Sequence, residues 1–452
     1  LHGGLVRRNS FQVVLMGVLL QAVGLVAPPP VSGQATRDSV PVVSLQEARR
    51  RASLVNPGAV AARAQVETAV SERRAALTDM FTPTVVANTS YIRFSEPFIN
   101  FGTFEQSLTA TSATLQANYT VFGSGKLSEL KRSRASLESA EASETAASYR
   151  TSLGTDAVYF GVLADRELSR VEAERLRRAQ EQFGIARVRV QAGEAISSDS
   201  LQLLLEVTRA RLAILRRDSA LAVSRLRLGR QIGLSGPVDA APIDTSAPPP
   251  LPLSQEEAIA EMRARGPELE AARAAERSAN AVIAAEREGY LPEIQLGAIT
   301  GAYDAEFFPS AAKRTQFTLT LSLPIWNGGQ RELAIARARA QRDVARAQRE
   351  DGERAAGELI AEAYHGYQTS RAGIELALIG VSVATENFRV QRARYREGAT
   401  TILDLLEAQV GLSEAESTLV QSRYATRLAL ARIEALLGRR IFETQNTNPT
   451  NR

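Results

Sequence analysis

Proline is absent from two long stretches of this chain, and this absence constrains the fold more than any other feature. No proline occurs between Pro97 and Pro237 or between Pro324 and Pro449. Proline removes a helical hydrogen bond and clashes with the preceding turn, so each stretch can form an uninterrupted helix. Aromatic residues make up only 6% of the chain, and alanine, arginine, glutamate and leucine are abundant. The sequence therefore predicts very long helices in two places.

The two proline-free stretches are similar to each other in sequence. At one constant offset Phe183 matches Phe388, Gly193 matches Gly398 and Asp199 matches Asp404. A repeat of this length predicts two copies of one structural unit. We predict a first repeat at 36–234, a linker rich in proline at 235–253, a second repeat at 254–440 and a disordered tail at 441–452.

Each half is predicted to have the same order of elements. A first helix, 45–80 or 254–289, is broken early by Pro57 or Pro267, and two strands follow near 84–122 or 293–326. Next comes a helix at 126–191 or 331–396, which at about 65 residues would be roughly 100 Å long. A turn at Gly193 or Gly398 leads into a returning helix, so each half ends in a helical hairpin.

The first 35 residues have the pattern of a secretory signal peptide. Arg7 and Arg8 precede an apolar run, and Gly33-Gln34-Ala35 has the form of a cleavage site. The apolar run is shorter than the ~20 residues that a membrane-spanning helix needs, which favours secretion over anchoring.

The strand regions alternate between apolar and polar residues. One set is Leu115, Ala117, Tyr119 and Val121 against Thr114, Gln116, Asn118 and Thr120; the other is Phe317, Leu319, Leu321 and Leu323 against Thr318, Thr320 and Ser322. This pattern is typical of a membrane barrel with a wet lumen, which the polar residues would line. The alternative is a soluble sandwich or a sheet covered by helices.

Four strands are too few to close a barrel around a channel. Open edges in lipid would leave backbone groups without hydrogen-bond partners, at several kcal/mol each. The membrane interpretation therefore requires other subunits to complete the barrel. The predicted fold class is mainly α with membrane β: a long helical bundle plus a barrel closed by oligomerisation.

The order of these motifs resembles the TolC-type outer-membrane factor family. The residues that carry the resemblance are 44–48 with Asn56-Pro57, the strand-to-helix joints at 121–125 and 324–329, and the turn at 397–409. The resemblance implies a trimeric channel of the outer membrane with a periplasmic helical tunnel. It also implies a periplasmic adaptor protein and an inner-membrane transporter, in an efflux pump or a type I secretion system, with passive conduction through the channel itself.

The resemblance also implies a gate at the periplasmic helix tips. The acidic residues of the constriction map to Asp404 and Glu407, with Asp199 as the counterpart in the first half, and Tyr395 falls in the closing network. Thr400 stands where family members have an arginine. Symmetry would turn each carboxylate into a ring that favours cations. The alternative for these acidic residues is a solvated helix face.

The same tips are the expected docking surface for an adaptor. The residues concerned are Gly193, Ile196, Gly398, Ile402 and Leu403. The alternative is that the apolar residues among them pack the end of the bundle.

Two other protein classes fit the sequence less well than a channel does. A periplasmic adaptor would need only one hairpin, and a structural coiled-coil protein of the envelope would lack the alternating strands. The chain has no cysteine and two histidines, so the sequence predicts neither an enzyme nor a metal or cofactor site. We also find no basic patch of the kind that nucleic acid would require.

Overall fold

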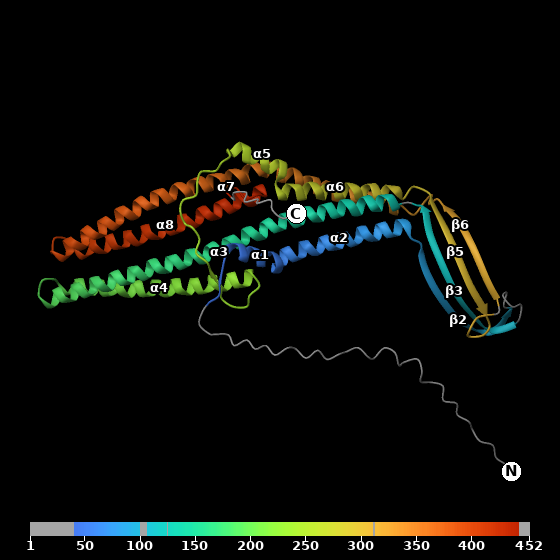
Figure 1. Ribbon diagram of the computed structural model, residues 1–452, viewed down its shortest axis with the longest axis horizontal. Coiled ribbons are helices and arrows are strands. Elements are labelled where there is room, and N and C mark those ends of the chain that lie inside the picture. Colours follow the sequence, from blue (N-terminus) through green and yellow to red (C-terminus); the bar gives the residue numbers. More distant parts are fainter. Residues whose placement is uncertain (1–39, 100–105, 124, 311, 443–452) are drawn as a thin grey trace, which may run out of the picture. The chain divides into compact units, whose positions relative to one another are not determined.

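The computed structural model describes residues 40–99, 106–123, 125–310 and 312–442. The predicted signal segment and most of the predicted tail lie outside these ranges. Eight helices are present in the described residues (Figure 1): α1 (Leu45–Val55), α2 (Pro57–Phe81), α3 (Lys126–Gln191), α4 (Ser197–Gln231), α5 (Gln255–Arg265), α6 (Pro267–Glu288), α7 (Gln330–Arg396) and α8 (Ile402–Leu437).

The two longest helices occupy the proline-free stretches. Helix α3 has 66 residues and α7 has 67, and neither is interrupted. In the first halves of the two sequence copies, the predicted breaks are confirmed at Pro57 and Pro267. Each proline begins a helix, where its missing N–H is tolerated because the first turn has no partner for it.

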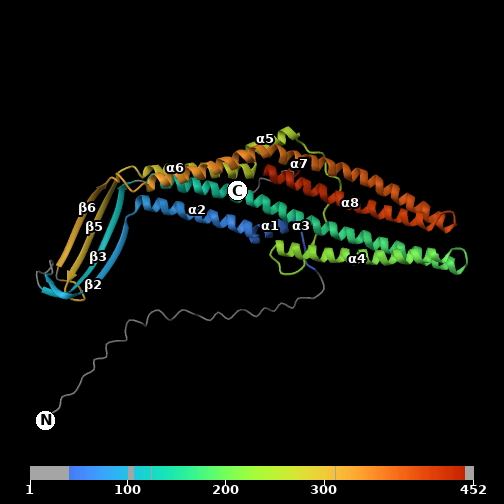
Figure 2. The ribbon, with the colours of Figure 1, turned by 180° about the vertical axis from the view of Figure 1, so that it is seen from behind.

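Helix α3 is at the centre of the helical packing. It contacts α2 and α6 near the sheet, α4 along its second half, and α8 on another side, while α7 packs against α6 and α8 (Figures 1 and 2). A middle cluster of buried side chains includes Tyr159, Leu163 and Leu228. A second cluster forms around Ile360 and Tyr367, and a third surrounds Tyr395 at the hairpin ends.

One antiparallel sheet contains the four predicted strands in the order β2-β3-β5-β6. Their bounds are β2 (Thr84–Ile99), β3 (Gln106–Phe122), β5 (Glu293–Asp304) and β6 (Ala312–Ser322). In the described part of the chain, β2 and β6 each pair with a neighbour on one side only. Both edges of the sheet therefore have unpaired backbone groups.

The register supports the predicted alternation over most of the sheet. Leu296 pairs with both Tyr119 and Leu319, and Gly297 pairs with both Asn118 and Thr318, so apolar and polar residues form separate rows. The polar face is not uniform, because Val86 and Ile299 both lie opposite Gln116.

The structure differs from the predicted alternation in two details. The register shifts between Thr120 and Phe122, so Phe122 rather than Val121 pairs with Ile294, because a bulge adds one residue to the strand. Strand β6 ends at Ser322, so Leu323 lies outside it. The next residue is Pro324, which has no N–H to donate to a strand ladder.

A second, two-stranded sheet was not predicted. Strands β1 (Val42–Val43) and β4 (Asp239–Ala240) pair in parallel. Tyr159 fixes this sheet to the middle of α3, because its hydroxyl is 3.1 Å from the carbonyl of Val43 and 2.8 Å from that of Ala241.

Among the described residues, no helix combines the length and the apolar character needed to cross a bilayer.

Candidate functional site

The ends of the two helical hairpins have closely similar backbones. The turns between α3 and α4 and between α7 and α8 contain Gly193 and Gly398, with φ of 77° and 71°. Glycine adopts this left-handed conformation without strain, and it allows the next N–H to bond back to the helix. Glu194 donates to the carbonyl of Arg189 and Ala399 to that of Arg394, both at 2.8 Å.

Tyr395 joins the two hairpins at this end. Its side chain is 1% exposed, and its hydroxyl lies 3.4 Å from Oδ2 of Asp199 on α4. The Arg189 guanidinium lies 5.3 Å from the ring centroid and donates to the Tyr395 carbonyl. Burial, followed by the nearby charge of Asp199, raises the pKa of Tyr395. The structure thus brings together two of the four residues assigned to the gate.

Asp404 caps the start of α8. Its Oδ2 accepts hydrogen bonds from the hydroxyls of Thr401 at 2.6 Å and Thr400 at 2.8 Å, and from the Thr401 N–H at 3.0 Å. The two threonine hydroxyls are the main reason why the pKa of Asp404 is lowered. Thr400 therefore has a partner within its own chain. Asp404 remains exposed, as does Glu407 one turn further along.

The apolar residues assigned to docking differ in exposure. Ile196 is 69% and Leu403 is 63% exposed, but Ile402 is 5% exposed and packs in the tip cluster with Leu405 and Phe388. Ile402 thus fits the alternative of bundle packing. Sequence reasoning missed Leu201 and Val188, which are also exposed near the turn. Both lie within about two helical turns of Gly193. Closeness to this glycine turn is the sequence signal that could have identified them.

A groove lies between α3 and α7 behind the tip. Its volume is about 510 Å³, and its lining includes Gly184, Val188, Arg392 and Arg396. Glycine at 184 leaves the groove floor without a side chain. Val188 is exposed in this groove, and Glu181, which pairs with Arg392 at 3.6 Å, also lines it, so the surface combines apolar and charged side chains of both signs.

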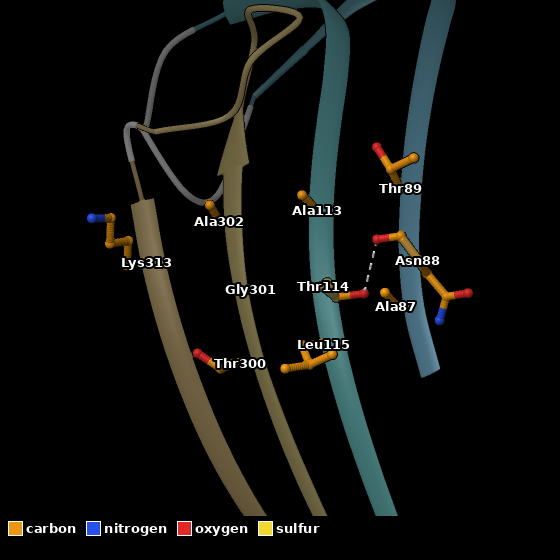
Figure 3. Close-up of a pocket in the computed structure, with 10 residues that line it drawn as sticks. All are labelled: Ala87, Asn88, Thr89, Ala113, Thr114, Leu115, Thr300, Gly301, Ala302 and Lys313. Atoms are coloured by element: carbon orange, nitrogen blue, oxygen red, sulfur yellow. Dashed lines mark hydrogen bonds between the residues drawn. The ribbon is translucent and has the colours of Figure 1, made fainter. Parts of the chain in front are cut away.

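The sheet has a shallow hollow on one face. Its volume is about 530 Å³, and small side chains such as Ala87, Ala113 and Ala302 form much of its lining, with Lys313 as the single charged residue (Figure 3). Thr114 lies 3.5 Å from the Asn88 carbonyl across the two strands. The described lining residues carry threonine hydroxyls and one lysine amine but no carboxylate and no imidazole.

The residues assigned to the lumen share one face of this sheet through the register described above. They are Thr114, Gln116, Asn118, Thr318, Thr320 and Ser322. On the opposite face Phe317 is 83% exposed, and Leu319 and Leu321 are exposed beside it. In the described ranges, no group of three or more acidic or histidine side chains is arranged to hold a metal ion.

Comparison with known proteins gives a consistent result. The family described as outer membrane efflux protein matches residues 48–234 and 258–439. A probable efflux pump outer membrane protein of Pseudomonas putida, TtgC, is 24% identical over 291 residues, covering 62% of this chain and 58% of TtgC. The match thus spans somewhat more than half the length of that relative.

Two solved structures show the same fold. CusC superposes with a TM-score of 0.73 at 19% identity, over 90% of this chain and 96% of CusC. The open state of the MtrE outer membrane channel of Neisseria gonorrhoeae superposes with a TM-score of 0.72 at 21% identity, over 87% and 89%. Because the family match extends over most of both halves of the sequence, the chain belongs to the outer membrane efflux protein family and is a protein of the outer membrane.

Proposed function

We propose that this chain is the exit channel of a tripartite efflux pump and that it works as a trimer. Each subunit would give four strands to one barrel, and the two helical hairpins of each subunit would form the wall of a periplasmic tunnel. The observation that carries this proposal is the sheet with two open edges and an exposed apolar face, on which Phe317 and Leu319 lie. Lipid would cover that face, and neighbouring subunits would pair the edges.

The proposal includes the repeat architecture. Helices α4 and α8 have 35 and 36 residues, close in length like α3 and α7, and each hairpin turns at a left-handed glycine. With two similar hairpins per subunit, a trimer would surround its axis with six nearly equivalent ones. The segments 36–234 and 254–440 would be the two repeats, and the segment 235–253 would join them.

The hairpin ends are the proposed gate. The link from Tyr395 to Asp199 would hold the hairpins of one subunit together, while Asp404 and Glu407 would face the axis as rings of carboxylates. MtrE has been described in an open state, which supports a fold that opens and closes. Conduction would be passive, because an inner-membrane transporter would supply the energy.

A periplasmic adaptor is the proposed partner at the tips. Ile196 and Leu403 are exposed apolar side chains beside the glycine turns, and the groove between α3 and α7 is adjacent. Apolar side chains surrounded by charged ones are typical of surfaces that bind another protein. The name of TtgC, an efflux pump protein, supports efflux as the process.

The decisive experiment measures ion selectivity of the purified trimer in a planar bilayer. The variant Asp404→Asn keeps an oxygen that can accept the threonine hydroxyls but removes the charge, so cation preference should fall several-fold. The variant Thr401→Ala loosens the cap and keeps the charge, and its selectivity should match that of the unmodified channel. If no preparation of the trimer conducts ions, the channel proposal is refuted. If the selectivity of Asp404→Asn is unchanged, the carboxylate ring is refuted.

A further inference from the structure

A layer of polar side chains lies between the packed helices α3 and α8, just behind the tip cluster. Arg178 on α3 bonds to Glu416 at 2.9 Å and to Ser413 at 3.4 Å, both on α8. Helix α3 runs toward the hairpin ends and α8 runs away from them, so the two helices are antiparallel (Figure 1). One turn nearer the tip than Arg178 is Gln182, and one turn nearer than Ser413 is Gln409. The two glutamines therefore lie at the same level of the seam.

Both glutamines are completely buried and lack hydrogen-bond partners among the described residues. Each is 0% exposed, and within the described ranges neither the amide nitrogen nor the amide oxygen of either side chain bonds to a protein group. Their apolar neighbours on the same helices include Ala186 on α3 and Leu405 and Leu412 on α8, while the bonded pair Arg178 and Ser413 lies one turn further from the tip. A neighbouring subunit cannot reach these atoms while α3 and α8 remain packed, because the burial occurs within one chain.

The seam inside the first hairpin is different. Between α3 and α4, Arg175 bonds to the buried carboxylate of Glu206 at 2.7 Å. This ion pair gives the buried Glu206 carboxylate a partner, whereas the amides of Gln182 and Gln409 between the hairpins have none among the described residues. Burial of an unpaired amide destabilises a packed state relative to one in which water can reach it.

We propose that Gln182 and Gln409 bias the gate toward opening. Separation of α8 from α3 would expose both amides to water and restore their hydrogen bonds, so the unpaired layer opposes the contacts that keep the tip closed. Those contacts are the apolar tip cluster, the Tyr395–Asp199 link and the Arg178–Glu416 pair. The two glutamines are positioning residues that set the balance between closed and open tips. This inference rests on the proposed gate.

The test replaces both glutamines by apolar residues of similar size in the full chain. In planar bilayers, the Gln182→Leu/Gln409→Leu double variant should show about a tenfold lower open probability than the unmodified trimer, and it should melt at a higher temperature. A second pair, Gln182→Met/Gln409→Met, guards against poor packing of leucine, because methionine is unbranched and adapts to irregular gaps. The control is Gln180→Leu/Gln421→Leu, at positions exposed on the same two helices, which should leave the open probability unchanged.

A third variant separates failure of this inference from failure of the gate. Tyr395→Phe removes the hydroxyl that bonds to Asp199 and should raise the open probability. If neither Tyr395→Phe nor either glutamine pair changes the open probability, both the gate and the inference are wrong. If Tyr395→Phe opens the channel but both glutamine pairs raise the open probability or lower the melting temperature, the polar layer stabilises the closed seam. That result would overturn the inference and leave the gate intact.

Discussion

Buried polar side chains in the middle of α3, such as Asp156 and Tyr159, are hydrogen-bonded, whereas some of those at its tip end are weakly bonded or unpaired within the described chain. In the middle, the buried Asp156 carboxylate accepts hydrogen bonds from Nε and Nη2 of Arg49, both at 2.6 Å. The Tyr159 hydroxyl lies within hydrogen-bond distance of two carbonyls. At the tip end, the Tyr395 hydroxyl makes one hydrogen bond of 3.4 Å, and the side-chain amide of Gln182 makes none with the described residues. Full pairing fixes one arrangement of helices, whereas weak or missing pairing lets two arrangements have similar free energies. We therefore interpret the middle as a rigid joint and the end as the part that moves.

The largest loss of stability should come from breaking the Arg49–Asp156 ion pair in the middle of α3. Asp156→Asn leaves Arg49 without its charged partner, and loss of one member of a mostly buried ion pair costs about 3 kcal/mol. Thermal unfolding followed by circular dichroism should show a clearly lower melting temperature, with no change in ion selectivity of the surviving channel. A variant as stable as the unmodified chain would mean that the middle of α3 is not held by this pair.

A smaller effect is expected at the start of α8. Thr401→Ala removes the hydroxyl that caps the helix and exchanges hydrogen bonds with Asp404, at a cost of about 1 kcal/mol. Limited proteolysis should cleave the 398–404 turn faster in this variant, while the middle of α3 should stay resistant. Equal acceleration in both regions would contradict the separation of a rigid part from a mobile one.

The smallest effect concerns pH. The folded state lowers the pKa of Asp404 below its ordinary value of 3.8, so its contribution to the cap is complete above that value and is lost as pH falls through the lower folded pKa. The cap should thus be unaffected between pH 5 and 8, and hydrogen exchange at the first turn of α8 should accelerate only in strong acid. Acceleration that already begins at about pH 6 would point to a different group.

Much of the architecture was predictable because proline and glycine act locally. Pro57 and Pro267 each start a helix, and Gly193 and Gly398 each take the left-handed turn, whatever surrounds them. The bulge at Thr120–Phe122 was not predictable from alternation, which assumes a regular ladder. The short β1–β4 sheet was missed because two residues have no measurable period.

The candidate site was predictable in position but less so in detail. The resemblance located Tyr395 and Asp199 at the tips, and the structure places them within 3.4 Å. Burial of Ile402 could not be read from the sequence, since apolar residues occur on both packed and exposed sides of a helix end. The same limit hid the buried glutamines, because glutamine is usually exposed and a polar residue in a helix predicts a solvated face.

The most direct measurement is chemical cross-linking between the two open edges of the sheet. The chain has no cysteine, so Asn88→Cys on β2 and Thr318→Cys on β6 would be the only reactive thiols in a double variant. If neighbouring subunits close one barrel, a short bifunctional thiol reagent should join the double variant into covalent trimers, while each single variant should stay monomeric on a denaturing gel. A double variant that remains monomeric in membranes where the channel conducts would contradict the account.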